Sequence, residues 1–151
     1  MSALKWMARA FGELDALTLH DILRLRVDVF VVEQNCPYPE LDGMDTEAVH
    51  ITGHRRDGNL VAYARIQPPD DDGLPHVGRV VVRHGQRGQG LGLRLMLEAL
   101  GTLDRLYGSK QSMVAAQAHL QRFYQQLGYV QKGGEYLLDG IPHIDMIRGD
   151  H

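Results

Sequence analysis

The chain has 151 residues, the usual size of one globular unit with a single core, so we expect one domain over residues 1–151. Hydrophobic residues make up 44% and charged residues 23% of the sequence, as in ordinary water-soluble folds. The formal net charge is -3 and the basic residues are scattered along the chain, so no nucleic-acid partner is expected.

Composition also argues against disulfides, metal clusters and membrane insertion. Cys36 is the only cysteine, so the sequence has neither an internal disulfide nor a thiolate metal cluster. Among the histidines, the one pair with the spacing of a helical metal site, His50 and His54, falls in a strand-like stretch, and no metal is predicted. No apolar run approaches about 18 residues and the N-terminus lacks the core of a signal peptide, so we expect a cytoplasmic protein that binds no membrane.

The first third of the chain predicts a strand, a helix and a loop. Residues 5–11 are typical of a short strand. A helix is expected over residues 18–33, because Thr18 and Asp21 form a variant of the capping box and apolar residues follow at helical spacing. Pro37 ends this helix, since proline cannot continue it and also restricts the residue before it. Residues 37–48 are acidic and rich in turn formers, which predicts a surface loop.

Further strands and two helices follow in the rest of the chain. The strands are expected at residues 50–54, 60–66, 77–82, 113–117, 129–138 and 141–147. Asp57-Gly58 and Asp139-Gly140 mark turns between neighbouring strands. Apolar spacing predicts an amphipathic helix at residues 91–106, and a shorter helix at residues 119–127 ends at Gly128. This order of elements indicates one mixed α/β domain.

The most informative segment is residues 80–92, where a valine strand runs through a glycine-rich turn directly into a helix. A helix start leaves backbone N–H groups without partners, and together with the helix dipole these groups form an anion site. Glycines let a phosphate approach the backbone closely, and Arg87 adds a positive charge. We therefore predict a pyrophosphate cradle that follows Val80, Val81 and Val82 and is formed by Arg87, Gly88, Gln89, Gly90, Leu91 and Gly92.

Spacing excludes two other phosphate-binding loops. A P-loop requires Lys and then Ser or Thr after its last glycine, but Gly90 is followed by Leu91 and Gly92. A dinucleotide fingerprint requires a third glycine where this chain has Leu93 or Leu95. A glycine turn without any ligand is the remaining alternative, and the valine run, the arginine and the immediate helix start all disfavour it.

Several segments resemble one enzyme family. Arg87-x-x-Gly90-x-Gly92 after a valine strand is similar to the acetyl-CoA-binding signature of the GCN5-related N-acetyltransferases, the GNAT family. Phe123-Tyr124-x-x-Leu127-Gly128-Tyr129 resembles that family's Tyr-x-x-x-Gly-aromatic stretch. Three more segments, at residues 30–38, 116–120 and 139–144, resemble its ElaA-like branch, and the resemblance extends from about residue 17 to residue 146.

The resemblance implies an α/β (mixed α+β) fold, in which helices flank a splayed, mixed, mainly antiparallel sheet of six to seven strands. The thioester arm of acetyl-CoA would then lie between the parallel strands at residues 77–82 and 113–117. By analogy, Val80, Val81 and Val82 are cofactor-binding residues, and backbone groups of Val80 and Val82 hold the pantetheine and polarise the acetyl carbonyl. Gln117 stands where many relatives have asparagine, so it is a cofactor-binding candidate whose side-chain contact is an open question.

The resemblance also implies a reaction, the direct transfer of acetyl from acetyl-CoA to a primary amine of a small molecule or peptide through a tetrahedral intermediate. This chemistry needs a neutral amine, a group that stabilises the oxyanion and an acid that protonates the departing thiolate. Tyr124 matches the family tyrosine that faces the sulfur, so it is the expected general acid and a cofactor contact. The alternative for Tyr124 is an ordinary core tyrosine beside Phe123.

The general base has three candidates. His143 lies in a predicted strand that borders the acceptor pocket in relatives, and an imidazole titrates near neutral pH. Glu33 ends the first helix, beside the loop that shapes acceptor specificity, while His76 is a weaker third candidate near the start of the strand before the cradle. Each of the three also has an ordinary structural explanation. His119 is expected to be structural or close to the cofactor.

Other questions stay open at the level of the sequence. Glu40, Asp42, Asp45 and Glu47 either attract a cationic acceptor or belong to a solvated loop. Cys36 is expected to serve as packing or as a pocket wall. The alternative to an enzyme is a CoA-binding sensor that has lost catalysis. Homodimers are common in the family, so a homodimer also stays open, and the sequence does not identify the amine.

Overall fold

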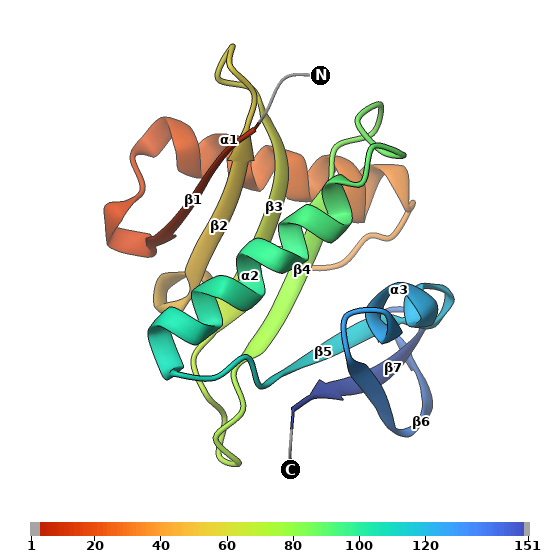
Figure 1. Ribbon diagram of the computed structural model, residues 1–151. Coiled ribbons are helices and arrows are strands. Elements are labelled where there is room, and N and C mark those ends of the chain that lie inside the picture. Colours follow the sequence, from red (N-terminus) through yellow and green to blue (C-terminus); the bar gives the residue numbers. More distant parts are fainter. Residues whose placement is uncertain (1–3, 150–151) are drawn as a thin grey trace.

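A seven-stranded sheet with the strand order β1-β2-β3-β4-β5-β7-β6 is the centre of the computed structural model, which describes residues 4–149 (Figure 1). Its strands are β1 (Lys5–Ala10), β2 (Val49–His54), β3 (Leu60–Gln67), β4 (His76–Val82), β5 (Ser112–Gln117), β6 (Tyr129–Leu138) and β7 (Ile141–Arg148). Neighbouring strands are antiparallel except for β4 and β5, which are parallel. The predicted mixed, mainly antiparallel sheet is therefore confirmed.

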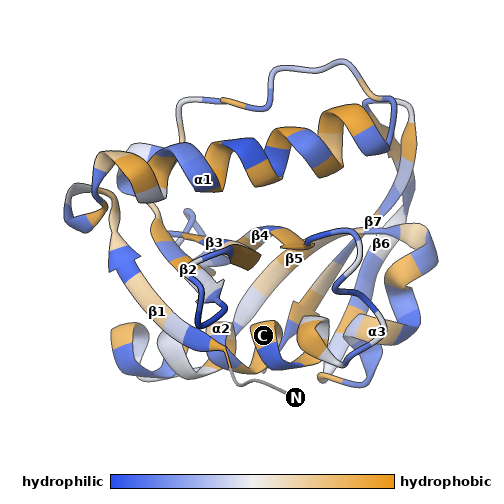
Figure 2. Cartoon of the chain, turned by 90° about the horizontal axis from the view of Figure 1, so that it is seen from above, coloured by the Kyte–Doolittle hydropathy of each residue, from blue (hydrophilic) through white to orange (hydrophobic). Residues whose placement is uncertain are grey.

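Helices cover both faces of this sheet (Figure 2). The helix α1 (Ala16–Arg26) and its π-helical continuation η2 (Val27–Glu33) lie on one face, while α2 (Leu91–Tyr107) and α3 (Gln121–Gln125) lie on the other. Short 3₁₀ turns are η1 (Phe11–Glu13), η3 (Asp45–Glu47) and η4 (Ala118–Leu120). No helix in residues 4–149 is long and apolar enough to span a membrane.

Two apolar cores hold the layers together. The larger core packs the buried face of α2 against β2 to β5 and β7, and its α2 members include Leu95, Met96, Ala99, Leu100 and Leu103. The smaller core joins α1 and η2 to β3 and β4, and its buried members are Ile22, Leu25, Val29, Leu60, Tyr63 and Val81. Because apolar side chains are buried on both faces of the sheet, packing stabilises it from two sides, and β4 lies between the two cores.

The pairing of β4 with β5 is short, and this shortness gives the sheet its splay. Only two residue pairs join them, His76 with Met113 and Val77 with Val114. Beyond Val77 the two strands diverge, and β5 leads away with β7 and β6 as a separate wing of the sheet (Figure 1). The predicted separation of two parallel strands is therefore present, and it leaves the second half of β4 without a neighbour on this side.

The start of α1 corrects one prediction. Asp15, and not Thr18, is the N-cap, because the Asp15 carboxylate accepts a hydrogen bond of 2.7 Å from the Thr18 N–H. Aspartate is among the strongest N-caps, and the helix therefore begins at Ala16. The far end of the prediction is confirmed, since helical backbone continues to Glu33 in the π-helical segment η2. Such segments are rare and occur often beside functional sites.

The acidic loop at residues 37–48 lies mostly at the surface, as predicted, but two of its carboxylates are not solvated. Glu40 and Asp45 are buried, with 4% and 8% of their surfaces exposed. Both carboxylates accept hydrogen bonds from the fully buried Arg26, at 2.7 Å to Glu40 and 2.8 Å to Asp45. Asp42 and Asp45 are further paired with Arg65, at 2.9 Å in each case. Most of the loop is therefore exposed, but Glu40, Asp42 and Asp45 do not form a free negative surface, because arginines distant in sequence pair with them.

Candidate active site

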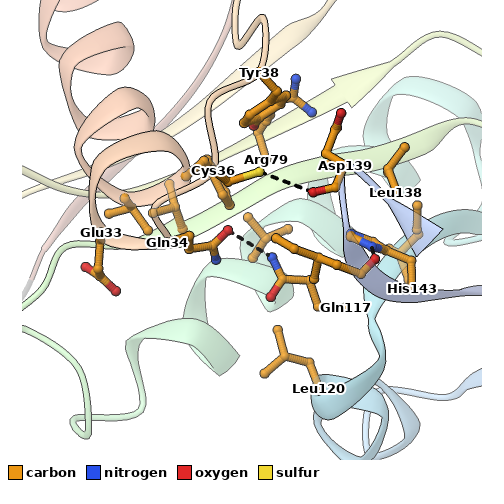
Figure 3. Close-up of a pocket in the computed structure, with 18 of the residues that line it drawn as sticks. Glu33, Gln34, Cys36, Tyr38, Arg79, Gln117, Leu120, Leu138, Asp139 and His143 are labelled. Carbon is orange, nitrogen blue, oxygen red and sulfur yellow. Dashed lines mark hydrogen bonds between the residues drawn. The ribbon is translucent and has the colours of Figure 1, made fainter.

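A cavity of about 640 Å³ opens where β4 and β5 diverge. Its walls are η2 and the loop after it, the length of β4 from Val77 to Val82, parts of β5 and η4, and the turn between β6 and β7 (Figure 3). The cavity brings together these predicted site residues: Glu33, Val80, Val81, Val82, Arg87, Gln117, Tyr124 and His143. Residues distant in the sequence therefore meet in one space, as an active site requires.

A β-bulge distorts β4 in the middle of this cavity. Between Gly78 and Val81, the two residues Arg79 and Val80 lie opposite a single residue of β3, Ala64. Arg79 has a φ of 51°, in the left-handed region that residues with a Cβ rarely adopt. Bulges leave the extra residue out of the ladder, so the backbone polar groups at this point are directed away from normal strand pairing. The Val80 backbone therefore lacks the regular pairing with β3 that an ordinary strand residue has.

The glycine-rich turn has the geometry expected of an anion site. Gly88 and Gly90 have φ values of 82° and 73°, and Gly90 is the left-handed N-cap of α2. The first helical hydrogen bond runs from the Arg94 N–H to the Gly90 carbonyl (3.1 Å), so the amides of residues 91–93 precede the ladder. A Cβ at Gly88 or Gly90 would meet no atom within 4 Å. Backbone conformation, and not crowding inside the protein, therefore requires glycine there, and the space above it is open to a ligand.

Arg87 lies between this turn and η2. Its Nε donates to the Val82 carbonyl (3.0 Å), and its two terminal nitrogens donate to the Glu33 carboxylate at 2.6 and 3.0 Å. The hydrogen bond from Arg87 lowers the pKa of Glu33 below its usual range. A carboxylate with a lowered pKa is a weaker proton acceptor, so the geometry argues against Glu33 as the general base.

Tyr124 is both a core residue and a wall of the cavity. Its ring is buried and meets Phe123 and Tyr129 edge-on, with centroids 5.1 and 5.8 Å apart. Burial, with a smaller contribution from Tyr129, raises the pKa of Tyr124 above its usual range, so the phenol keeps its proton at neutral pH. None of the residues in 4–149 forms a hydrogen bond with its hydroxyl group. Both sequence-based descriptions of Tyr124 are thus compatible with its position.

His143 lies on β7, directly across from Gln117 on β5, and is largely buried. Its Nδ1 lies 2.7 Å from the Ile141 carbonyl oxygen, which can only accept, so Nδ1 carries the proton in the neutral ring. The opposite nitrogen, Nε2, then has a free lone pair. Tyr136 stacks on the imidazole, with an interplanar angle of 27°, and fixes the orientation of the ring. This arrangement suits a proton acceptor.

Two weak contacts cross the cavity from the segment after α1 to its far wall (Figure 3). The Gln117 amide lies 3.4 Å from Gln34, and the Cys36 thiol lies 3.4 Å from the carbonyl oxygen of Asp139. Cys36 therefore forms part of the cavity wall. The Gln117 side chain is directed toward Gln34 across the cavity and does not pack into the core.

Other histidines have different positions. His76, the third base candidate, does not line the cavity and instead pairs with Asp70 at 2.7 Å, at the opposite end of β4. His119 lines the cavity from η4. His50 is fully buried between the Tyr63 hydroxyl (2.6 Å) and a backbone carbonyl (2.9 Å). Within the part of the chain that the structure describes, no group of three or more potential ligands is arranged for a metal ion.

Sequence reasoning did not identify Arg79, Tyr38 or Asp139, which also line the cavity. One signal for Arg79 was present, since a charged residue directly after Gly78 interrupts an otherwise apolar strand. Glycine in a strand interior often marks a bulge or a close backbone approach. Tyr38 and Asp139 lie in a loop and a turn, where no periodic pattern indicates which way a side chain points.

Comparisons with known proteins agree with this geometry. The acetyltransferase (GNAT) domain family matches residues 21–148. Protein ElaA of Escherichia coli (strain K12) is 45% identical over 148 residues, which cover 96% of this chain and 96% of ElaA. The crystal structure of an acyl-CoA N-acyltransferase from Pseudomonas aeruginosa is 43% identical, has a TM-score of 0.92, and covers 97% of this chain and 100% of that one.

The crystal structure of Escherichia coli ElaA is also similar, with 42% identity, a TM-score of 0.89, and coverage of 97% of this chain and 99% of that one. Both the cradle and the Tyr124 segment fall inside the matched residues 21–148. The fold is that of the acyl-CoA N-acyltransferase from Pseudomonas aeruginosa over nearly the whole chain. The chain therefore belongs to the GNAT acyltransferase family, in its ElaA-like branch.

Proposed function

We propose that this protein is a single N-acetyltransferase domain that moves an acetyl group from acetyl-CoA directly to a primary amine of a small molecule or peptide. The observation that carries the proposal is the continuity of one cavity, which runs along β4 and reaches both Tyr124 and His143. The open amides at the start of α2 suit the pyrophosphate of the donor, because anions bind at helix N-termini. Arg87 adds a guanidinium at the end of β4 beside them.

The acceptor must first lose a proton. An alkyl ammonium with a pKa of about 10.4 is almost fully charged at pH 7, and supplying the neutral amine costs about 5 kcal/mol. In the proposed mechanism the Nε2 lone pair of His143 takes that proton, directly or through a water molecule. The Nδ1 contact with the Ile141 carbonyl then stabilises the resulting imidazolium, because a charged donor strengthens that hydrogen bond.

Attack and collapse follow. The amine nitrogen bonds to the thioester carbonyl carbon, and in the proposal the backbone N–H of Val80 stabilises the developing oxyanion. The carbon–sulfur bond then breaks and Tyr124 donates its proton to the departing thiolate. The second proton of the amine, lost as the amide forms, restores Tyr124. The products are an N-acetylated amine and CoA, and the His143 imidazolium releases the first proton to solvent. No covalent enzyme intermediate is needed.

Two measurements test the proposal. Acetyl-CoA should raise the thermal unfolding temperature, and free thiol should appear when acetyl-CoA is mixed with amines from a panel of polyamines, amino acids and peptides. A parallel series of propionyl-CoA and longer acyl-CoA donors tests the acetyl preference. Stabilisation by acetyl-CoA without thiol release across the whole panel would favour a CoA-binding sensor. Absence of both effects would contradict any donor role for the cavity.

A further inference from the structure

The left-handed backbone at Arg79 is unfavourable for a residue with a Cβ, so some contact must hold it. Such strained residues persist only where the surrounding structure determines them. The side chain of Arg79 supplies that contact. Its Nε donates to a carboxylate oxygen of Glu40 at 2.7 Å, and its terminal nitrogen lies 3.3 Å from the Glu40 carbonyl and 3.4 Å from Asp42. The guanidinium also lies over the Tyr38 ring, 5.7 Å from its centroid.

Glu40 is a fixed anchor because it is held from the other side. The same carboxylate oxygen that binds Arg79 also accepts a 2.7 Å hydrogen bond from Arg26, which is fully buried under the loop. Arg26 in turn binds Asp45 at 2.8 Å, and Asp45 binds Arg65 at 2.9 Å. Moving Glu40 would take from the buried Arg26 one of its two carboxylate partners and leave only Asp45, which is unfavourable for a buried guanidinium. The loop is therefore rigid at the point where Arg79 is attached.

The ion pair between Arg79 and Glu40 matters for catalysis because of where the strained residue lies in the chain. Arg79 precedes Val80, whose backbone the proposed function uses to polarise the acetyl carbonyl. If Arg79 returned to ordinary extended φ values, the bulge opposite Ala64 would relax and the Val80 amide would turn. A donor aimed at an oxyanion is effective only within a narrow geometry.

We propose that the Arg79–Glu40 ion pair is a clamp that holds the β4 bulge in its left-handed form and thereby positions the Val80 amide for acyl transfer. Arg79 is then a positioning residue that acts through the backbone. This inference rests on the proposed function for its catalytic consequence. Its structural part, the orientation of the Val80 amide, is measurable without turnover.

Two substitutions that differ by one methyl group test the clamp. Arg79→Ala removes the ion pair but keeps a Cβ, so the bulge relaxes. Arg79→Gly removes the same ion pair, yet glycine adopts a φ of 51° freely, so the bulge persists. Loss of an oxyanion donor lowers kcat by about 10²- to 10³-fold, so we expect kcat to fall by at least tenfold in Arg79→Ala. In Arg79→Gly kcat should lie within about threefold of the wild-type value, because the Val80 amide keeps its orientation.

Binding supplies the readout that needs no turnover. The acetyl carbonyl, which CoA lacks, should lose its hydrogen bond in Arg79→Ala, so the preference for acetyl-CoA over CoA falls by about two- to tenfold. The Arg79→Gly variant should keep the wild-type preference. Arg79→Asn belongs in the series because asparagine tolerates the left-handed region better than alanine, and it should fall between the other two. Thermal unfolding of each variant establishes that it is folded.

The outcomes separate the explanations. An order of kcat and of acetyl-CoA preference that follows Gly, Asn, Ala supports the clamp. Equal losses of kcat and acetyl-CoA preference in all three variants would show that Arg79 acts through its own side chain in the cavity. Wild-type values in all three variants would show that Arg79 has no role in acyl transfer. Either result overturns the proposal. If the wild type acetylates no amine, the proposed function fails, while the acetyl-CoA preference still decides the clamp.

Discussion

The role of Tyr124 can be separated from its place in the core by comparison with its neighbour Tyr129. Both tyrosines are buried and their rings touch edge-on, but only Tyr124 lines the cavity. The Tyr129 hydroxyl instead forms a 2.6 Å hydrogen bond with Ser112, which is fully buried. The two Tyr→Phe substitutions therefore remove one oxygen atom each from adjacent positions with different surroundings.

The expected effects are opposite. General acid catalysis contributes about 10²- to 10⁴-fold, so Tyr124→Phe should lower kcat by roughly 10²-fold or more. Its stability should be unchanged, because no hydrogen bond to the Tyr124 hydroxyl exists among residues 4–149. Tyr129→Phe leaves the buried Ser112 hydroxyl unpaired, which costs about 1–3 kcal/mol. Each kcal/mol lowers the Tm of a domain of this size by roughly 2–4 °C, while kcat should stay near the wild-type value.

The assay pairs thiol release from acetyl-CoA with thermal unfolding for the wild type and both variants. The affinity for acetyl-CoA, measured by calorimetry, should be retained in Tyr124→Phe, since proton donation acts only in the transition state. Unchanged kcat in Tyr124→Phe would remove Tyr124 as the general acid and leave it as a core residue. An equal loss of kcat in both variants would show that packing around the aromatic pair, and not the proton, controls the rate.

Three further predictions concern the cradle, the Glu33 pair and the acidic loop. Gly90→Ala should weaken acetyl-CoA binding, because a Cβ enters the open anion site. Gly85 also has a positive φ, so Gly85→Ala is the control and should leave binding unchanged. An equal loss of acetyl-CoA affinity in both variants, measured by calorimetry, would contradict this prediction. Glu33→Gln frees Arg87 from an exposed ion pair worth about 0.2–1 kcal/mol. Acetyl-CoA should therefore bind up to about fivefold more tightly, and kcat should be retained. A large fall in kcat would instead identify Glu33 as the general base. Although burial opposes ionisation of Asp42, hydrogen bonds from Arg65 and the Met44 amide lower its pKa to about 2. The stability it contributes is present above its unfolded pKa of about 3.9 and is lost as the pH falls toward 2, so denaturant unfolding of Asp42→Asn should show a weaker pH dependence across that window.

Local patterns in the sequence predicted the elements well. Strand and helix periodicity depends on neighbours along the chain, so the seven strands and α2 lie close to their predicted bounds. The glycine turn was also recognisable, since positive φ at Gly88 and Gly90 is a local requirement. The N-cap was misplaced at Thr18 because two capping residues lie within one helical turn, and the hydrogen bond to Asp15 decides between them.

Long-range pairing could not be predicted in the same way. The bulge at Arg79 is a property of the β3–β4 register, which no single strand sequence contains. The loop was correctly placed at the surface, but the burial of Glu40 and Asp45 within it was not predicted, because the partners Arg26, Arg65 and Arg79 come from three other elements. The pairing of Glu33 with Arg87 likewise joins residues 54 positions apart, so the weakened basicity of that carboxylate was not visible in the sequence.

The short seam between β4 and β5 has a mechanical consequence. Because only two residue pairs join the strands, the wing formed by β5, β7 and β6 depends on side-chain packing for its attachment to the rest of the sheet. A donor arm seated between the strands would take over hydrogen bonds that the backbone does not make with itself. We therefore expect acetyl-CoA to act as a missing strand, so that amide hydrogen exchange along the inner edges of β4 and β5 slows on binding, more than at the outer edges of β1 and β6. The sheet would then be continuous along the full length of β4 and β5 only when acetyl-CoA is bound.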